Sequence, residues 1–362
     1  VGESSHSPDV GEAIRPGRTA PLGIPDRAGS QCTTSTPTGL DIVTGIVAVA
    51  PLVEELVPAP SVLAALQSLS NLDDVVLMES RGRNSAVSRY SFLAADPFAF
   101  VELDCPGQGQ DPFVRLREFS DRFHSPAVPG LPPFQGGAAG VLGYELGGAW
   151  ERLSLPEWDE FALPVLAVGL YDWVIAWDHQ SDRAWVISQG FPETDPARRQ
   201  RRASDRLAEV HTRLKGTDSG PDASPAASAR VDLRRMAPCW PAEGPGGLLS
   251  DFSRESYLAA VEAVIDYIHA GDIFQANLSQ RLLFPQATPA SELYARLRQC
   301  NPAPFAGYVA HDDWALVSAS PERFVCLRDG AVETRPIKGT RPRQDDSQVE
   351  VLLRGDLYES QK

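Results

Sequence analysis

Residues 333–343 (ETRPIKGTRPR) hold the side chain with the clearest chemical potential in this sequence, Lys338. Pro, Gly and Thr around this lysine are typical of a constrained turn that exposes backbone N–H groups to an anion. Arg335, Arg341 and Arg343 add positive charge, which attracts a carboxylated substrate and is expected to lower the pKa of the lysine by like-charge repulsion. A lysine with a lowered pKa can act as a nucleophile or base near neutral pH, whereas arginine cannot.

The scarcity of lysine strengthens this interpretation. Lysine occurs only at positions 215, 338 and 362, against 33 Lys and Arg residues in total. The chain therefore uses arginine where it needs a generic cation, and a lysine inside a motif favours a chemical role. The structural alternative is a surface loop with a solvated lysine.

A second candidate is Glu322, within residues 318–324 (SASPERF). A carboxylate that follows a strand and the turn at Pro321 is placed where a general acid can project. The alternative is an ion pair with the neighbouring Arg323.

Residues 272–282 alternate in the manner of a strand, with polar side chains on one face: Gln275, Asn277, Ser279 and Arg281. Such a face is either the solvated side of a sheet or the lining of a polar pocket.

The elements expected to position these residues alternate between strand and helix. Apolar runs predict strands at residues 75–79, 165–177, 184–188, 307–310, 315–320 and 324–327, and residues 91–94 precede a turn signal at Asp96 and Pro97. Helical spacing predicts a helix at residues 113–123. A second helix is expected to begin after the N-cap Ser253 and to end at Gly271, and a third to begin at Thr288 and Pro289. Small residues at 134–144 suggest a close approach of backbones. No period of 20–50 residues repeats.

Composition excludes several classes of protein. The net charge is −15 and no basic stripe is present, so no nucleic-acid partner is expected. The five cysteines are scattered without a CxxC pair, which favours a reduced, cytoplasmic compartment over a zinc or disulfide framework. The longest apolar stretches fall far short of the roughly 20 residues that a membrane span needs, so no membrane partner is expected.

Six segments in order resemble the chorismate-utilising enzymes. Three are downstream, at residues 271–281 (GDIFQANLSQR), 320–324 (SPERF) and 336–343 (PIKGTRPR), and three upstream, at residues 77–80 (LMES), 88–97 (SRYSFLAADP) and 134–144 (FQGGAAGVLGY). The resemblance covers roughly residues 50–362. It implies an α/β (α+β) fold like that of anthranilate synthase component I, with packed antiparallel sheets flanked by helices.

The residue before the Gly-Thr pair separates the branches of this family. Aminodeoxychorismate synthases commonly carry Lys there, as at Lys338, whereas anthranilate, isochorismate and salicylate synthases usually carry Ala. The resemblance implies that Lys338 attacks chorismate, that Glu322 protonates the leaving hydroxyl, and that Gly339 and Thr340 contact the substrate. Ammonia would come from glutamine on a partner amidotransferase subunit, and the product would serve 4-aminobenzoate and folate synthesis.

The resemblance also implies an amino-acid pocket that holds tryptophan. Glu79 and Ser80 match one of its elements, and Pro304 and Phe305 match the other. Ordinary turn and strand packing is the alternative for these four residues.

Magnesium is the cofactor that the resemblance implies, but the two glutamates that bind it in the family would lie beyond Lys362. A His, a Tyr and an Arg near the substrate would lie there too. The chain is therefore expected to be truncated at its C-terminus, to contain no metal ligand and to be inactive alone.

These interpretations give four segments. Residues 1–38 are expected to be a disordered leader and 39–215 the N-terminal region of the anthranilate synthase component I type. A linker at 216–250 and a partial chorismate-binding catalytic region at 251–362 would follow. Two alternatives stay open: anthranilate synthase component I, and a non-catalytic fragment that binds an amino acid or a partner.

Overall fold

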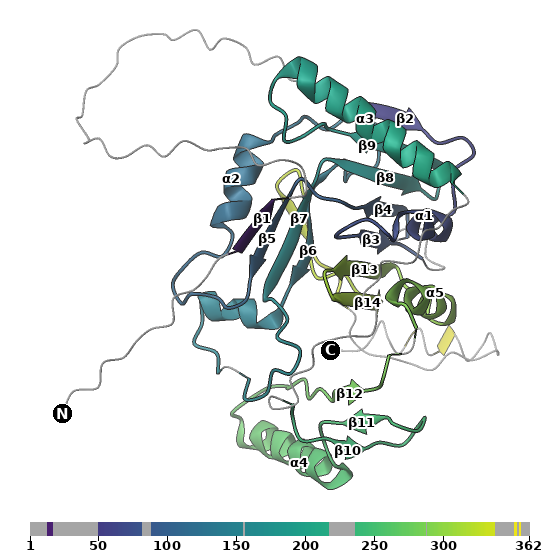
Figure 1. Ribbon diagram of the computed structural model, residues 1–362. Helices are drawn as coiled ribbons and strands as arrows, with labels where there is room; N and C mark the ends of the chain where they lie inside the picture. Colours follow the sequence, from purple (N-terminus) through teal and green to yellow (C-terminus); the bar gives the residue numbers. More distant parts are fainter. Residues whose placement is uncertain are drawn as a thin grey trace, which may run out of the picture.

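Two antiparallel sheets form the centre of the molecule (Figure 1). The computed structural model describes residues 13–16, 50–81, 88–154, 156–216, 236–286, 288–336, 351–352 and 355. The larger sheet has the strand order β14-β13-β3-β4-β8-β9-β2. Its strands are β2 (Leu52–Glu55), β3 (Val76–Glu79), β4 (Tyr90–Ala94), β8 (Trp173–Asp178), β9 (Arg183–Ser188), β13 (Phe305–His311) and β14 (Trp314–Ser320).

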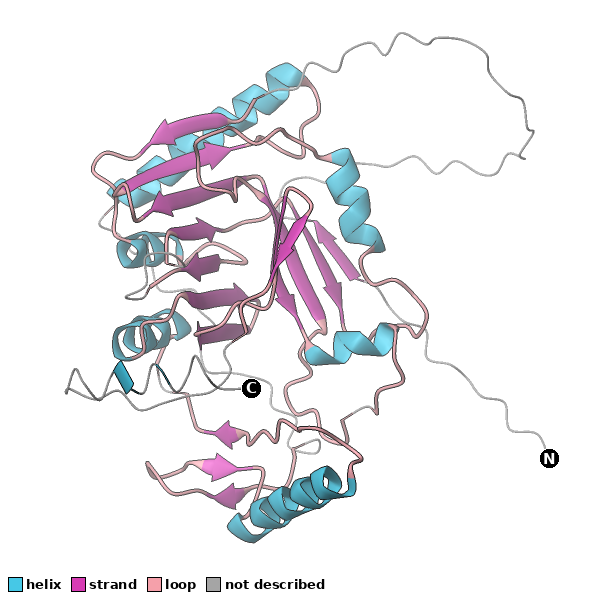
Figure 2. Ribbon diagram, turned by 180° about the vertical axis from the view of Figure 1, so that it is seen from behind, coloured by secondary structure: helices cyan, strands magenta, loops and turns pink. Residues whose placement is uncertain are grey.

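Three helices cover one face of this sheet, as Figure 2 shows: α1 (Val62–Leu69), α3 (Pro196–Lys215) and α5 (Ala290–Cys300). Leu66, Val210 and Tyr294 from these helices pack with Leu77 and Ile175 of the sheet in one buried core. The Ser61 hydroxyl caps α1 and the Asp195 carboxylate caps α3. Each accepts a hydrogen bond from a backbone N–H in the first turn, which has no partner within the helix.

The smaller sheet has the order β1-β5-β7-β6 and packs against the other face. It contains β1 (Ala13–Pro16), β5 (Ala99–Leu103), β6 (Gly137–Leu142) and β7 (Leu166–Tyr171), with α2 (Val114–Arg122) and the 3-10 helix η1 (Tyr144–Ala149) beside it. A Cβ on Gly140 would lie 2.0 Å from the carbonyl oxygen of Ala167. The close backbone approach predicted from the small residues at 134–144 is therefore confirmed.

Asp172 divides what the sequence predicts as one strand at 165–177. β7 belongs to the smaller sheet and β8 to the larger one, and Asp172 lies fully buried between them. Its carboxylate pairs with Arg202 at 3.2 Å, and its carbonyl oxygen accepts a 2.6 Å hydrogen bond from the Gln189 N–H. Burial raises the pKa of Asp172, whereas the positive charges of Arg202 and Arg206 act to lower it. These partners compensate for the cost of a buried carboxylate at the bend between β7 and β8.

A smaller unit with α4 (Arg254–Ala270), β10 (Trp240–Pro241), β11 (Leu249–Ser250) and β12 (Leu282–Leu283) lies beside the main body (Figure 1). The predicted Ser253 cap and the left-handed Gly271 stop of α4 are confirmed. Its predicted apolar face is not buried by described residues, since Ile265 and Ile268 are 44% and 39% exposed.

Several sequence expectations differ from the structure. Residues 272–281 form no strand, because no described strand lies alongside to complete a hydrogen-bonded ladder. The helix predicted from Thr288 begins one residue later, with Pro289 as its N-cap. The segment 216–250, expected as a linker, contains β10 and β11 in its described half. Within the expected leader, Ala13–Pro16 form β1 and pair with β5.

The larger sheet also crosses the boundary expected at residue 250, since β13 and β14 join strands of the N-terminal region. Within the described residues, no helix is both long and apolar enough to cross a membrane.

His311 joins the two sheets through charge. Its Nδ1 lies 2.5 Å from Asp74 Oδ1, beside the larger sheet, and its Nε2 lies 2.8 Å from Glu102 Oε2 on β5. The imidazole stacks on Phe100 with ring centroids 4.1 Å apart. Burial alone lowers the pKa of His311, but the hydrogen bonds to both carboxylates outweigh it and raise the pKa to about 9. The imidazolium thus offsets two partly buried negative charges at the sheet junction.

We expect the contribution of His311 to the free energy of unfolding to depend on pH. Its pKa is higher in the folded state than in the unfolded chain, so the stabilisation is complete below about pH 6.5 and lost as pH rises through about 9. The stability difference between the wild type and His311→Gln should reach about 3 kcal/mol at pH 6 and shrink towards pH 9.5. Denaturant unfolding at several pH values measures it, with the exposed His124→Gln as control. A difference that is constant with pH would contradict the charge-based junction.

Candidate functional site

The pairing of β3 with β13 builds a cavity from two distant parts of the chain. The register places Ala306 opposite Glu79, and the Arg81 N–H donates to the Ala303 carbonyl oxygen at 2.8 Å. A cavity of about 800 Å³ opens beside this pairing. All four residues predicted for the amino-acid pocket line it: Glu79, Ser80, Pro304 and Phe305. The two motifs thus lie around one cavity, and its assignment as an amino-acid pocket stays a prediction.

Glu79 does not offer a free carboxylate to this cavity. It is 2% exposed, and its Oε1 and Oε2 accept hydrogen bonds of 2.7–2.9 Å from the guanidinium of Arg298. The Tyr294 hydroxyl donates a further 2.7 Å bond to Oε2. Burial and the adjacent Glu79 raise the pKa of Tyr294, which stays a hydrogen-bond donor. Glu79 therefore fixes β3 to α5 and supports the cavity from behind.

The backbone of Ser80 is held by a chain of polar groups that sequence reasoning missed. The Ser80 N–H donates to Ser91 Oγ at 3.1 Å, and that hydroxyl lies 2.7 Å from His179 Nε2. Burial lowers the pKa of His179, although Glu79 and Asp178 raise it, which favours the neutral imidazole as acceptor. Ser91 belongs to the family-like segment 88–97, which was the available signal for its role.

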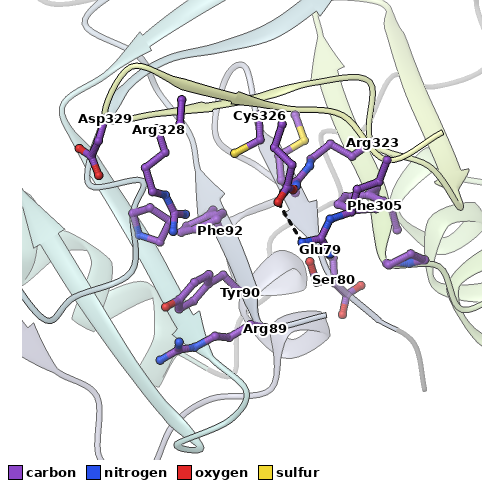
Figure 3. Close-up of a pocket in the computed structure, with 17 residues that line it drawn as sticks. Glu79, Ser80, Arg89, Tyr90, Phe92, Phe305, Arg323, Cys326, Arg328 and Asp329 are labelled. Atoms are coloured by element: carbon purple, nitrogen blue, oxygen red, sulfur yellow. Dashed lines mark hydrogen bonds and ion pairs between the residues drawn. The ribbon is translucent and has the colours of Figure 1, made fainter. Parts of the chain in front are cut away.

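The cavity combines aromatic surface with cationic groups (Figure 3). Tyr90 and Phe92 of β4 lie on one side and Phe305 of β13 on another. Among the charged residues, Arg89 is engaged by Asp178 at 2.9 and 3.1 Å, which holds the pKa of that carboxyl below its usual range. The remaining charged lining residues are Glu79, Arg323, Arg328, Asp329, Glu333 and Arg335.

Such a lining suits an amphipathic ligand with a ring and a carboxylate, because aromatic side chains supply apolar contact and arginine binds carboxylates. The sequence motifs named Glu79, Ser80, Pro304 and Phe305 for this pocket. Arg323 and Arg335 were named only for an ion pair and for the positive charge near Lys338, and the fold brings their segments to the cavity.

Glu322 lies just beyond the end of β14 and is exposed. The Ser320 hydroxyl donates to the Glu322 carbonyl oxygen at 2.8 Å and accepts from the Glu322 N–H at 3.3 Å, so this turn is closed by a side chain. Ser320 pairs with Phe305, which places the turn at the rim of the cavity. Lys338, Gly339 and Thr340 lie outside the described residues.

The expected polar face at residues 275–281 is not assembled as a strand. Arg281 instead forms a 2.9 Å ion pair with Glu160, whose side chain is fully buried. Its backbone N–H donates to Asp251 Oδ1 at 2.9 Å. The ion pair connects the start of β12 to the main body, and the hydrogen bond connects it to the residue after β11.

The described residues contain no group of three or more His, Cys, Asp or Glu side chains arranged to hold a metal ion. The expectation of magnesium stays a prediction.

Comparison with known proteins identifies the family. Residues 73–362 match the family of chorismate-binding enzymes. The chain belongs to this family. Anthranilate synthase component 1 of Thermus thermophilus is 36% identical over 295 residues, which are 79% of this chain and 58% of that protein. Aminodeoxychorismate synthase component 1 of Salmonella typhimurium is 35% identical over 240 residues, 66% of this chain and 46% of the relative. This family member thus spans about half the length of these relatives.

A solved structure supports the fold. Anthranilate synthase component I from Streptococcus pneumoniae TIGR4 superposes with a TM-score of 0.56 at 22% identity, over 76% of this chain and 57% of that one. The expected mixed α/β fold with antiparallel sheets and helices is confirmed.

We expect Arg298→Met to destabilise this chorismate-binding family member strongly, because it leaves the buried Glu79 carboxylate without its cation. Loss of one partner of a buried ion pair costs about 3–5 kcal/mol. Arg296→Met is the matched control on the same helix, since Arg296 pairs with Glu292 where both side chains are more than half exposed. That variant should change the free energy of unfolding by less than about 1 kcal/mol. Equal losses in the two variants would show that Glu79 is not held as described.

Proposed function

We propose that this protein transfers ammonia to chorismate and forms 4-amino-4-deoxychorismate. The observation that carries the proposal is Lys338, within the sequence PIKGT of a chain that belongs to the chorismate-binding enzymes. Relatives with both names, aminodeoxychorismate synthase and anthranilate synthase, match at similar identity. The residue type at position 338 is therefore what favours one branch over the other.

The proposed reaction has two substitutions. The Lys338 amine attacks C2 of chorismate while the 4-hydroxyl departs, and Glu322 gives that hydroxyl a proton so that it leaves as water. Ammonia then adds at C4 and the lysine amine leaves from C2, so both atoms and charges balance. Nucleophilic catalysis is usually favourable because a covalent adduct divides one difficult step into two easier ones. The ammonia would come from glutamine, hydrolysed on a partner amidotransferase subunit.

Two described contacts support the assignment of the segments. The Thr334 hydroxyl donates to the Phe324 carbonyl oxygen at 2.9 Å, and Arg323 forms an ion pair with Glu333. They join the segment that holds Glu322 to the chain leading towards Lys338. Glu322 is also exposed at a cavity rim, where a substrate can reach it.

The second candidate is the formation of anthranilate, which the similarity to the Thermus relative favours. That branch commonly carries Ala at the position of Lys338. The two products differ in fluorescence, so one assay of chorismate conversion separates them.

We also propose that the cavity beside β3 and β13 binds tryptophan, because it offers aromatic faces and arginines to one ligand. Calorimetric titration of tryptophan should show saturable binding, and Phe305→Ala should weaken it about tenfold through loss of the aromatic contact. Phe284→Ala, which lies outside the cavity lining, is the control. Absence of binding, or equal affinity in Phe305→Ala, would argue against the tryptophan site.

The main test is Lys338→Ala in the full-length gene product that contains this chain, assayed with chorismate, ammonia and magnesium. Aminodeoxychorismate formation should be abolished because the nucleophile is removed, and the product should shift towards anthranilate. Lys215→Ala, at the exposed end of α3, is the matched control and should retain the wild-type rate. Unchanged aminodeoxychorismate turnover in Lys338→Ala would refute the covalent mechanism.

A further inference from the structure

A two-stranded hairpin covers one side of the cavity. This hairpin begins directly after the segment that holds Glu322. Its strands are β15 (Cys326–Arg328) and β16 (Ala331–Glu333), with Cys326 opposite Glu333 in the register. Figure 3 shows Cys326, Arg328 and Asp329 above Phe92 and Tyr90. Among the described strands, β15 and β16 pair only with each other. Within the part of the chain that the structure describes, side-chain contacts such as that of Arg323 with Phe305 connect this segment to the larger sheet.

Glu333, the last residue of β16, pairs with the two arginines that flank the hairpin, and one of them, Arg323, contacts Phe305 of β13. The Glu333 carboxylate pairs with Arg323, which follows Glu322 in the sequence, and with Arg335 at 2.9 Å. The guanidinium of Arg323 also lies over the Phe305 ring, 5.7 Å from its centroid. Its Nε is buried and has no hydrogen-bond partner among the described residues. The Glu333 carboxylate is thus the acidic partner that holds this arginine.

Glu322 therefore has a constrained backbone on both sides. Ser320 closes the turn before it, and Arg323, anchored by Glu333, fixes the residue after it. The bond from Thr334 to the Phe324 carbonyl oxygen adds a second link from the neighbour of Glu333 to the same segment. Within the described residues, the Glu322 side chain has no hydrogen-bond partner, so its direction depends on this backbone.

We propose that Glu333 is a positioning residue, which sets the placement of Glu322 at the cavity rim by holding Arg323. This inference rests on the proposed function, in which Glu322 is the general acid. The side chain of Glu333 is 46% exposed and that of Arg323 is 29% exposed, so their pair contributes little to global stability. A displacement of about 1 Å in a reacting group can still cost up to about 10²-fold in rate. Loss of Glu333 should thus affect catalysis far more than folding.

The test compares Glu333→Gln and Glu333→Asp with wild type in the full-length gene product. Glu333→Gln should lower kcat about tenfold and leave KM for chorismate within about threefold, because substrate binding is kept while the acid is misplaced. Glu333→Asp keeps the carboxylate and should restore most of kcat. Glu322→Gln sets the scale, with a loss of about 10²-fold or more. Glu118→Gln, which breaks an exposed ion pair with Arg115 on α2, is the matched control and should not change kcat.

A second readout needs no activity. Amide hydrogen exchange at residues 320–325 should become faster in Glu333→Gln than in wild type and stay unchanged in Glu118→Gln. Unchanged exchange, or a normal kcat in Glu333→Gln, would overturn the positioning role. A parallel loss of kcat, KM and melting temperature would also overturn it, in favour of a general structural role. If the wild type converts no chorismate, the proposed function fails, and the exchange measurement still decides whether Glu333 holds this segment.

Discussion

The pairing of β3 with β13 is the contact on which the rest of the site depends. It joins residues 76–79 to residues 306–309, more than two hundred positions apart in the chain. Its backbone hydrogen bonds place Glu79 beside α5 and bring Ser80 next to Pro304 and Phe305. β14 then extends the sheet and delivers Ser320 and the Glu322 turn to the same rim. The cavity and the Glu322 turn thus lie together because both are formed at the ends of neighbouring strands of one sheet.

Three charged side chains are buried where the layers of this fold meet, and each has a partner of opposite charge nearby. Glu79 is held by Arg298, Asp172 by Arg202, and His311 by two carboxylates. Glu79 lies between the larger sheet and α5, and His311 lies between the two sheets. Asp172 lies between β7 of the smaller sheet and β8 of the larger one. Buried charges without partners are strongly destabilising, so these contacts favour one arrangement of the layers over others.

The cavity and the Glu322 segment share structural parts. Arg323 and Glu333 line the cavity and also hold the residue next to Glu322. A ligand under the β15–β16 hairpin would contact the same side chains that fix this turn.

The sequence by itself determined the family, the helix limits at Ser253 and Gly271, and most of the strands, because these depend on local periodicity, caps and short motifs. It also named the four residues that line one side of the cavity. Only the tertiary structure decided that the Glu79 carboxylate points to Arg298, that Asp172 splits a single apolar run between two sheets, and that residues 272–281 form no strand. These outcomes depend on partners far away in the sequence. A carboxylate turns towards whichever cation the fold supplies, and a strand forms only where another strand completes its hydrogen bonds.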